Sequence, residues 1–147
     1  MFKPERKYYI QNGEFHESKR FDVSTIQGQF VYEVIRIISG KAVFLNDHID
    51  RLMSSLQQSI INASSRDLEI QQQVKKLLDI TPAQDGNIML CLSEKDNQFH
   101  SFIFFIEHHY PSEDEYINGV EVRSLKATRN NPNAKIWNDT LRKQAET

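Results

Sequence analysis

The chain has 147 residues, of which 39% are hydrophobic and 26% charged, an ordinary composition for one soluble globular domain. A formal net charge of −2 gives no concentrated basic face, so we expect neither nucleic acid nor a membrane surface as a partner. The longest apolar run covers residues 102–106, far short of the roughly 20 residues that a membrane-spanning helix needs. The single cysteine, Cys91, cannot form an internal disulfide, which favours a reducing, cytoplasmic location.

The first part of the chain has the features of antiparallel β-structure. A β-rich segment at 7–11 is followed by Asn12-Gly13, a dipeptide that favours a tight hairpin turn because both positions tolerate positive φ. Residues 30–38 are β-branched and aromatic and predict a strand, which a short strand at 42–45 follows after a turn. Alternation along 30–38 predicts two faces, one with Tyr32, Val34, Arg36 and Ile38 and the other with Val31, Glu33, Ile35 and Ile37.

Two amphipathic helices are expected next. Asn46 is a good N-cap for the first helix. Its apolar residues follow the helical repeat at Ile49, Leu52, Met53, Leu56 and Ile60. The second helix is expected over 66–79 and ends before Pro82, which disfavours helical backbone in the residue that precedes it.

The second half of the chain predicts three more strands and a final helix. Residues 88–92 and 99–108 predict a pair of strands, and the second is apolar on both faces, as in a central strand that is covered on both sides. An acidic, exposed loop is expected at 111–116, a last strand at 120–125 and a helix over 136–146. The whole pattern predicts an α+β domain in which an antiparallel sheet packs with two helices.

Arg51 is the first residue with possible chemistry. It lies one turn into the first helix, where its permanent charge and the positive helix end both suit a phosphate dianion. His48, three residues earlier, lies on the same helix face. From spacing alone the alternative is an exposed arginine that pairs with Asp47 or Asp50.

Lys135 is the second residue with possible chemistry. A lysine becomes a useful amine for carbonyl chemistry only where its surroundings favour the neutral form and fix it beside a bound aldehyde. Lys135 follows an Asn/Pro-rich turn at 130–133 and precedes a helix, so the backbone can aim its side chain. The alternative is a solvated surface charge at the start of a helix.

Three histidines could suggest a metal site, but their spacing does not support one. His100, His108 and His109 lie along one predicted strand without matching cysteines or carboxylates, and the last two point to opposite faces. We therefore predict no metal ligands.

Two segments far apart in the sequence resemble the class IV family of pyridoxal-phosphate enzymes. The first covers residues 28–52, reads GQFVYEVIRIISGKAVFLNDHIDRL and ends in an HxxRL motif. The second covers residues 129–135, reads RNNPNAK, and is followed by Asn138 and a Lys-Gln-Ala-Glu stretch at 143–146. The family includes D-amino-acid and branched-chain aminotransferases and aminodeoxychorismate lyase, and aminotransfer is the expected reaction, with the lyase reaction as the alternative.

The resemblance assigns roles to four side chains. It implies that Lys135 binds pyridoxal 5'-phosphate covalently and later moves the proton at the substrate Cα, and that Arg51, with His48 on the same face, contacts the cofactor phosphate. Tyr32 matches a tyrosine that lines the active site and helps to hold the substrate carboxylate, although a tyrosine packed against the sheet is an equal alternative.

Two neighbours of Tyr32 receive weaker assignments. Arg36 shares its face and could reach an anionic substrate, whereas Glu33 matches an acidic position on the opposite face, where a structural role is expected. The Arg-Gly loop that binds the substrate carboxylate in many relatives is absent, and residues 92–96 read LSEKD instead. The substrate is expected to be an amino acid or a 2-oxo acid of unspecified kind.

The resemblance also implies a domain organisation. Residues 1–127 match the N-terminal α+β domain, and residues 128–147 match the start of the cofactor-binding domain. Because family members place further cofactor-binding groups beyond the position of Thr147, we expect a truncated, inactive chain that forms a homodimer. The non-enzymatic alternative is a degenerate relative that folds and dimerises without catalysing a reaction.

Overall fold

The computed structural model describes residues 2–26, 28–61, 69–81, 85–129 and 131–145. Six strands form one antiparallel sheet in the order β2-β1-β6-β5-β3-β4, which confirms the predicted α+β class. The strands are β1 (Tyr8–Gln11), β2 (Glu14–Glu17), β3 (Phe30–Ile38), β4 (Lys41–Ala42), β5 (Gly86–Lys95) and β6 (Gln98–Ile106). The helices are α1 (Leu45–Gln57), α2 (Ile70–Ile80), α3 (Glu113–Asn118) and α4 (Asp139–Ala145), with short 3-10 turns at Ser18–Arg20 and Val23–Ile26. Among the described residues, no helix has the length and apolar character needed to cross a membrane.

The hairpin at the start of the chain forms as predicted. Asn12 and Gly13 both have positive φ, 51° and 85°, between β1 and β2. The Asn12 side chain also accepts a hydrogen bond from the Ser101 backbone N–H at 2.9 Å, and this bond ties the turn to β6.

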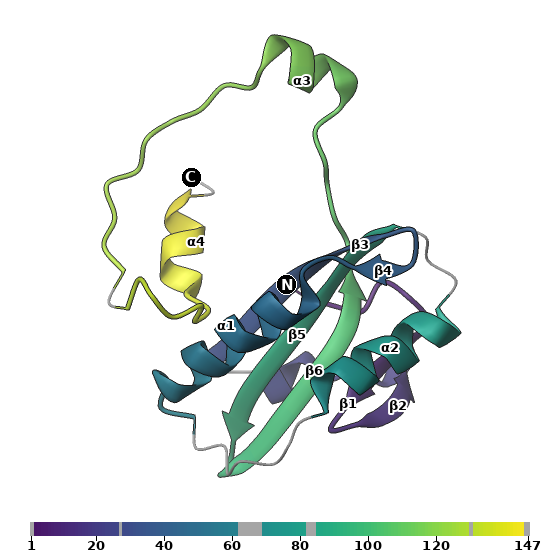
Figure 1. Cartoon of the computed structure of the whole chain (residues 1–147). Helices are drawn as coiled ribbons and strands as arrows, with labels where there is room; N and C mark the ends of the chain where they lie inside the picture. Colours follow the sequence, from purple (N-terminus) through teal and green to yellow (C-terminus); the bar gives the residue numbers. More distant parts are fainter. Residues whose placement is uncertain (1, 27, 62–68, 82–84, 130, 146–147) are drawn as a thin grey trace.

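The sheet separates two cores. On one face α1 and α2 lie side by side over the strands, and their apolar residues form one buried cluster with Val31, Ile35 and Ile37 of β3 (Figure 1). The other face carries a smaller, aromatic cluster around Phe30, Phe102 and Phe104. The predicted alternation along β3 is confirmed, because Val31, Glu33, Ile35 and Ile37 are buried beneath the helices. The covered central strand predicted at 99–108 forms as β6, between β1 and β5, but it ends at Ile106.

The start of α1 differs from the prediction. Phe44, with a φ of 51° in the left-handed region, occupies the N-cap position, so the helix begins at Leu45 without a side-chain cap. Asn46 therefore is not the N-cap, and its Oδ1 accepts a hydrogen bond from Gln71 of α2 instead. The strand predicted at 42–45 is reduced to β4, because the chain has already turned into the helix. Part of the second predicted helix, residues 66–68, lies outside the described residues.

After β6 the chain leaves the sheet in a long excursion and returns to it near α1 (Figure 1). The loop predicted at 111–116 is instead partly helical, because Ser112 and Glu115 form a capping box at the start of α3. The strand predicted at 120–125 is wrong. The described residues provide no neighbouring strand there for its backbone, and Val120 and Val122 are exposed.

The last helix begins later than predicted. Ile136 forms an antiparallel bridge with Val31, so it belongs to the sheet edge and not to the helix. Asn138 then ends the extended segment, and its Oδ1 accepts the backbone N–H of Leu141 at 3.0 Å, as an N-cap does.

Candidate functional site

The site lies at the open edge of β3, where α1, β3 and the C-terminal segment meet. The Tyr32 N–H donates to the Lys135 carbonyl at 3.1 Å, and the Trp137 N–H donates to the Phe30 carbonyl at 2.9 Å. The Lys135 N–H donates to the Ser55 hydroxyl of α1 at 2.9 Å, and Ser55 is fully buried. These bonds fix the backbone of Lys135 between a strand and a helix.

A buried carboxylate brings the predicted residues together. Glu33 has no exposed side-chain surface, and its Oε1 accepts a hydrogen bond from Arg51 Nε at 2.5 Å while its Oε2 accepts one from Arg51 Nη2. The same Oε2 lies 2.9 Å from His48 Nδ1 and 3.5 Å from Lys135 Nζ. Lys135 therefore joins Arg51 and His48, which lie more than 80 residues earlier in the sequence, around one buried charge.

This arrangement rules out the alternatives given for Arg51 and Lys135. Arg51 does not pair with Asp47 or Asp50, because Glu33 of the neighbouring strand holds its guanidinium. Lys135 is not a solvated surface charge, since only 27% of its side chain is exposed.

The surroundings of Lys135 lower the pKa of its amine. Burial lowers the pKa of Lys135, and Arg51 and Arg129 lower it further, while the nearby Glu33 carboxylate opposes them without restoring the ordinary value. Burial raises the pKa of Glu33, but hydrogen bonds from Arg51 and His48 outweigh it and hold that pKa below its usual range. Glu33 is therefore ionised at neutral pH, and Lys135 meets the requirement for a reactive amine more closely than a surface lysine does.

Arg51 retains donor capacity toward solvent. Its Nε and Nη2 bind Glu33, whereas its Nη1 makes no hydrogen bond to any residue that the structure describes. The side chain is 52% exposed, so this free edge of the guanidinium is open to a ligand. An anion with several oxygens, such as a phosphate, suits such an edge.

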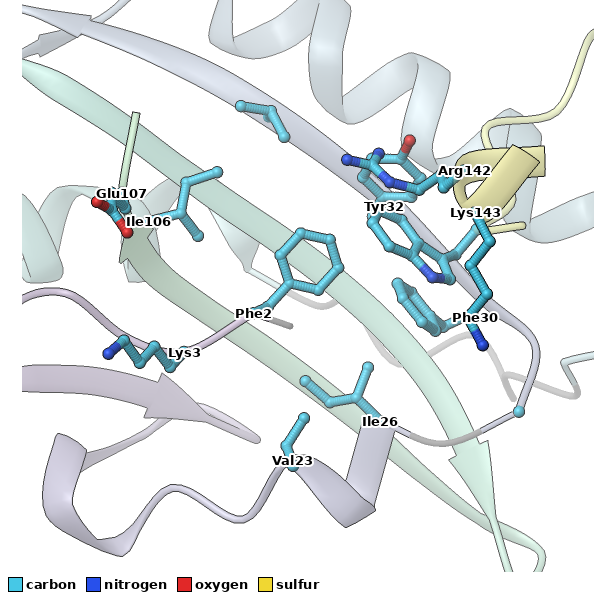
Figure 2. Close-up of a pocket in the computed structure, with 13 residues that line it drawn as sticks. Phe2, Lys3, Val23, Ile26, Phe30, Tyr32, Ile106, Glu107, Arg142 and Lys143 are labelled. Carbon is cyan, nitrogen blue, oxygen red and sulfur yellow. The ribbon is translucent and has the colours of Figure 1, made fainter. Parts of the chain in front are cut away.

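Tyr32 connects the cluster to a hollow on the opposite face of the sheet. Its ring centre lies 5.0 Å from Lys135 Nζ and 5.3 Å from the Trp137 ring. The hollow measures about 740 Å³, and Figure 2 shows Phe2, Phe30 and Tyr32 on its walls, with Arg142 and Lys143 of α4 at one end. An aromatic wall with basic side chains at its rim can accommodate a small organic anion.

Arg36 lies on the same face as Tyr32, as predicted, but outside this cluster. Its guanidinium stacks 3.7 Å from the ring centre of Tyr110, whose hydroxyl donates to Asn87 Oδ1 at 2.6 Å. The structure thus brings together Tyr32, His48, Arg51 and Lys135, and leaves Arg36 with other partners.

Glu33 is the site residue that the sequence reading underestimated. The signal was present, because a glutamate in the buried row of β3, between Val31 and Ile35, needs a cationic partner. The sequence alone could not identify that partner. Which residues of α1 face β3, and that residue 135 returns to the edge of β3, are determined only by the tertiary structure. Within the described part of the chain, no cluster of three or more His, Cys, Asp or Glu side chains could hold a metal ion.

Comparison with known proteins identifies the family of this chain. Residues 30–146 match the family model of class IV amino-transferases, so the chain belongs to that family. It is 41% identical to a D-alanine aminotransferase from Bacillus licheniformis over 63 residues, which cover 43% of this chain and 22% of that protein.

Solved structures share the fold at low sequence identity. A branched-chain amino acid aminotransferase from Escherichia coli is 15% identical with a TM-score of 0.62, over 75% of this chain and 43% of that chain. A putative branched-chain amino acid aminotransferase from Thermotoga maritima is 20% identical with a TM-score of 0.61, over 90% and 50%. A 4-amino-4-deoxychorismate lyase from Pseudomonas aeruginosa is 15% identical with a TM-score of 0.55, over 76% and 44%. The chain spans half or less of the length of each of these relatives.

Proposed function

We propose that this chain carries part of a pyridoxal-phosphate site, in which Lys135 binds the cofactor and Arg51 binds its phosphate. The observation that carries the proposal is the approach of both side chains to the single buried carboxylate of Glu33, at 2.5 Å for Arg51 Nε and 3.5 Å for Lys135 Nζ. Family membership supports it, and one structural relative, a hypothetical aminotransferase from Mycobacterium tuberculosis, is described in a form with the cofactor bound.

The residues present fit the three parts of that cofactor. The free Nη1 edge of Arg51 suits the phosphate, the half-buried amine of Lys135 suits the aldehyde, and the ring of Tyr32 offers an aromatic wall beside the amine. His48 lies beside Arg51 on α1, with its Nδ1 directed to Glu33, and helps to hold the arginine in this position.

The reaction follows from what these side chains can do. Bound pyridoxal phosphate supplies an electron sink that stabilises negative charge at the Cα of an amino acid. Lys135 Nζ would take the proton from the substrate Cα and return it as a general acid-base. Tyr32 and the hollow beside it would hold the substrate carboxylate, and the suggestion that Arg36 assists stays a prediction.

Aminotransfer between an amino acid and a 2-oxo acid is the reaction we propose. The family description and the D-alanine aminotransferase relative support it, and the aminodeoxychorismate lyase reaction is the second candidate because a lyase shares the fold. We further propose that residues 1–127 are an N-terminal domain and residues 128–147 the start of a second one, and that the protein is a homodimer. Exposed apolar residues on the excursion, including Ile117 and Val122 at 80% and 82%, support a partner surface there.

The test is a titration of the purified chain with pyridoxal phosphate, followed by the visible absorption of lysine-bound cofactor. The matched variants are Lys135→Ala and Lys126→Ala, since Lys126 is an exposed lysine in the preceding loop. A saturable band that is lost in the first variant and kept in the second supports the proposal. A spectrum identical to free cofactor in all three proteins contradicts it and favours the non-catalytic, dimerising relative.

A further inference from the structure

The group at the centre of the site is Glu33, which carries no role in the proposed chemistry. It is a glutamate with no exposed side-chain surface, placed between two cationic side chains and a histidine. We propose that Glu33 is a positioning residue whose charge is taken up by Arg51, so that the amine of Lys135 has no counter-ion of its own. This inference rests on the proposed function, in which that amine is the reactive group.

The distances show which cation the carboxylate serves. Arg51 binds both oxygens in a two-pronged arrangement, and His48 Nδ1 lies 2.9 Å from Oε2. Lys135 Nζ is the most distant of the three, at 3.5 Å from the same Oε2, beyond the usual range of about 2.7–3.2 Å. The strong bonds of Glu33 therefore go to Arg51, and the lysine receives only a weak one.

The balance of charge follows from these contacts. Arg51 is protonated at every accessible pH, so the ionised Glu33 and Arg51 form a neutral pair. Among the residues that the structure describes, the other groups near Lys135 are the ring of Tyr32, the imidazole of His48 on the far side of Glu33 Oε2, and the positive charge of Arg129. None of them adds a negative charge at neutral pH. Burial lowers the pKa of the Lys135 amine, and the occupied carboxylate does not reverse this.

Substitutions in the pair should move the titration of Lys135 in opposite directions. Glu33→Gln removes the negative charge and leaves the positive charge of Arg51 beside the amine, so the titration midpoint should fall. Arg51→Met releases Glu33 to Lys135, so the midpoint should rise. The double variant should return close to the unsubstituted protein, because both charges are then absent.

A merely structural role predicts a different pattern. If Glu33 and Arg51 only hold the fold together, either single substitution loosens the site and exposes Lys135. Both midpoints would then rise toward the ordinary value of a solvated lysine, and the double variant would rise as well.

The experiment is reductive methylation of the whole chain with formaldehyde and cyanoborohydride over a range of pH, without cofactor. Peptide mass spectrometry reports the extent of methylation of each lysine separately. Each rate is normalised to its plateau at high pH, and exposed Lys126 serves as the internal control. A carboxylate this close typically shifts an amine by about one pH unit or more, so the neutral fraction at pH 8 should change about tenfold in each direction. Shifts of the same sign in the two single variants, or no shift in either, would overturn the inference.

One further variant, compared with Arg51→Met, keeps the inference testable if Glu33→Gln does not fold. Arg51→Lys keeps the positive charge and should bring the midpoint back toward that of the unsubstituted protein, whereas Arg51→Met should not. Equal midpoints in these two variants also overturn the inference. Since methylation needs no cofactor, a failed cofactor titration refutes the proposed function alone, and failed methylation shifts refute the positioning role alone.

Discussion

Arg51→Met should destabilise the fold through the carboxylate that it leaves behind. Glu33 has no exposed side-chain surface, and without Arg51 its charge keeps only His48 and the more distant Lys135 as partners. Breaking a fully buried ion pair costs about 3–5 kcal/mol. Arg51 is 52% exposed, and water and the two remaining partners offset part of that cost. We therefore expect the free energy of unfolding to fall by about 2 kcal/mol.

Urea denaturation followed by far-UV circular dichroism measures this change. The matched control is Lys75→Met, which breaks an exposed ion pair with Asp79 on α2 and should cost about 0.5 kcal/mol or less. Adding Glu33→Gln to Arg51→Met should recover most of the lost stability, because the buried charge is then gone. The reasoning is refuted if Arg51→Met costs no more than Lys75→Met, or if the second substitution recovers nothing.

Three other predictions concern the stability of the fold. Although burial raises the pKa of Glu33, its hydrogen bonds lower it below the ordinary value, so the chain should lose stability as the pH falls through that lowered pKa. Urea midpoints measured between pH 3 and 6 should show this loss, and the loss should be smaller in Glu33→Gln. Leu52→Ala should cost about 2–5 kcal/mol in the same assay because Leu52 is fully buried, whereas Leu125→Ala, at 51% exposure, should cost less than about 1 kcal/mol. Gly13→Ala should cost about 1 kcal/mol because the φ of Gly13 is 85°, and thermal unfolding should register the change as a lower Tm.

Local sequence patterns predicted much of the sheet. The Asn12-Gly13 turn and the alternation along residues 30–38 depend on nearest neighbours, and both agree with the structure. The strand predicted at 120–125 depended on a partner strand that the described residues do not supply, and alternation alone cannot show whether such a partner exists. The capping box at Ser112 was readable, since a serine three residues before a glutamate signals a helix start.

The candidate site was predictable in its members and not in its organisation. The resemblance named Lys135, Arg51, His48 and Tyr32, and the structure brings all of them to one edge of β3. The resemblance did not reveal that Glu33 connects these residues. The contacts of Glu33 depend on how the buried face of β3, the first turns of α1 and the segment around residue 135 are placed relative to one another. A charged residue in an otherwise apolar row marks the position to inspect first.

The central claim is that Lys135 is the lysine to which the cofactor becomes attached. Its most direct test is to mix the intact chain with pyridoxal phosphate, fix the adduct with borohydride and locate the added mass by peptide mass spectrometry. The account predicts that the mass lies mainly on Lys135, at cofactor concentrations too low to modify exposed lysines such as Lys126. Modification spread over the exposed lysines, with Lys135 no more labelled than the others, would contradict it.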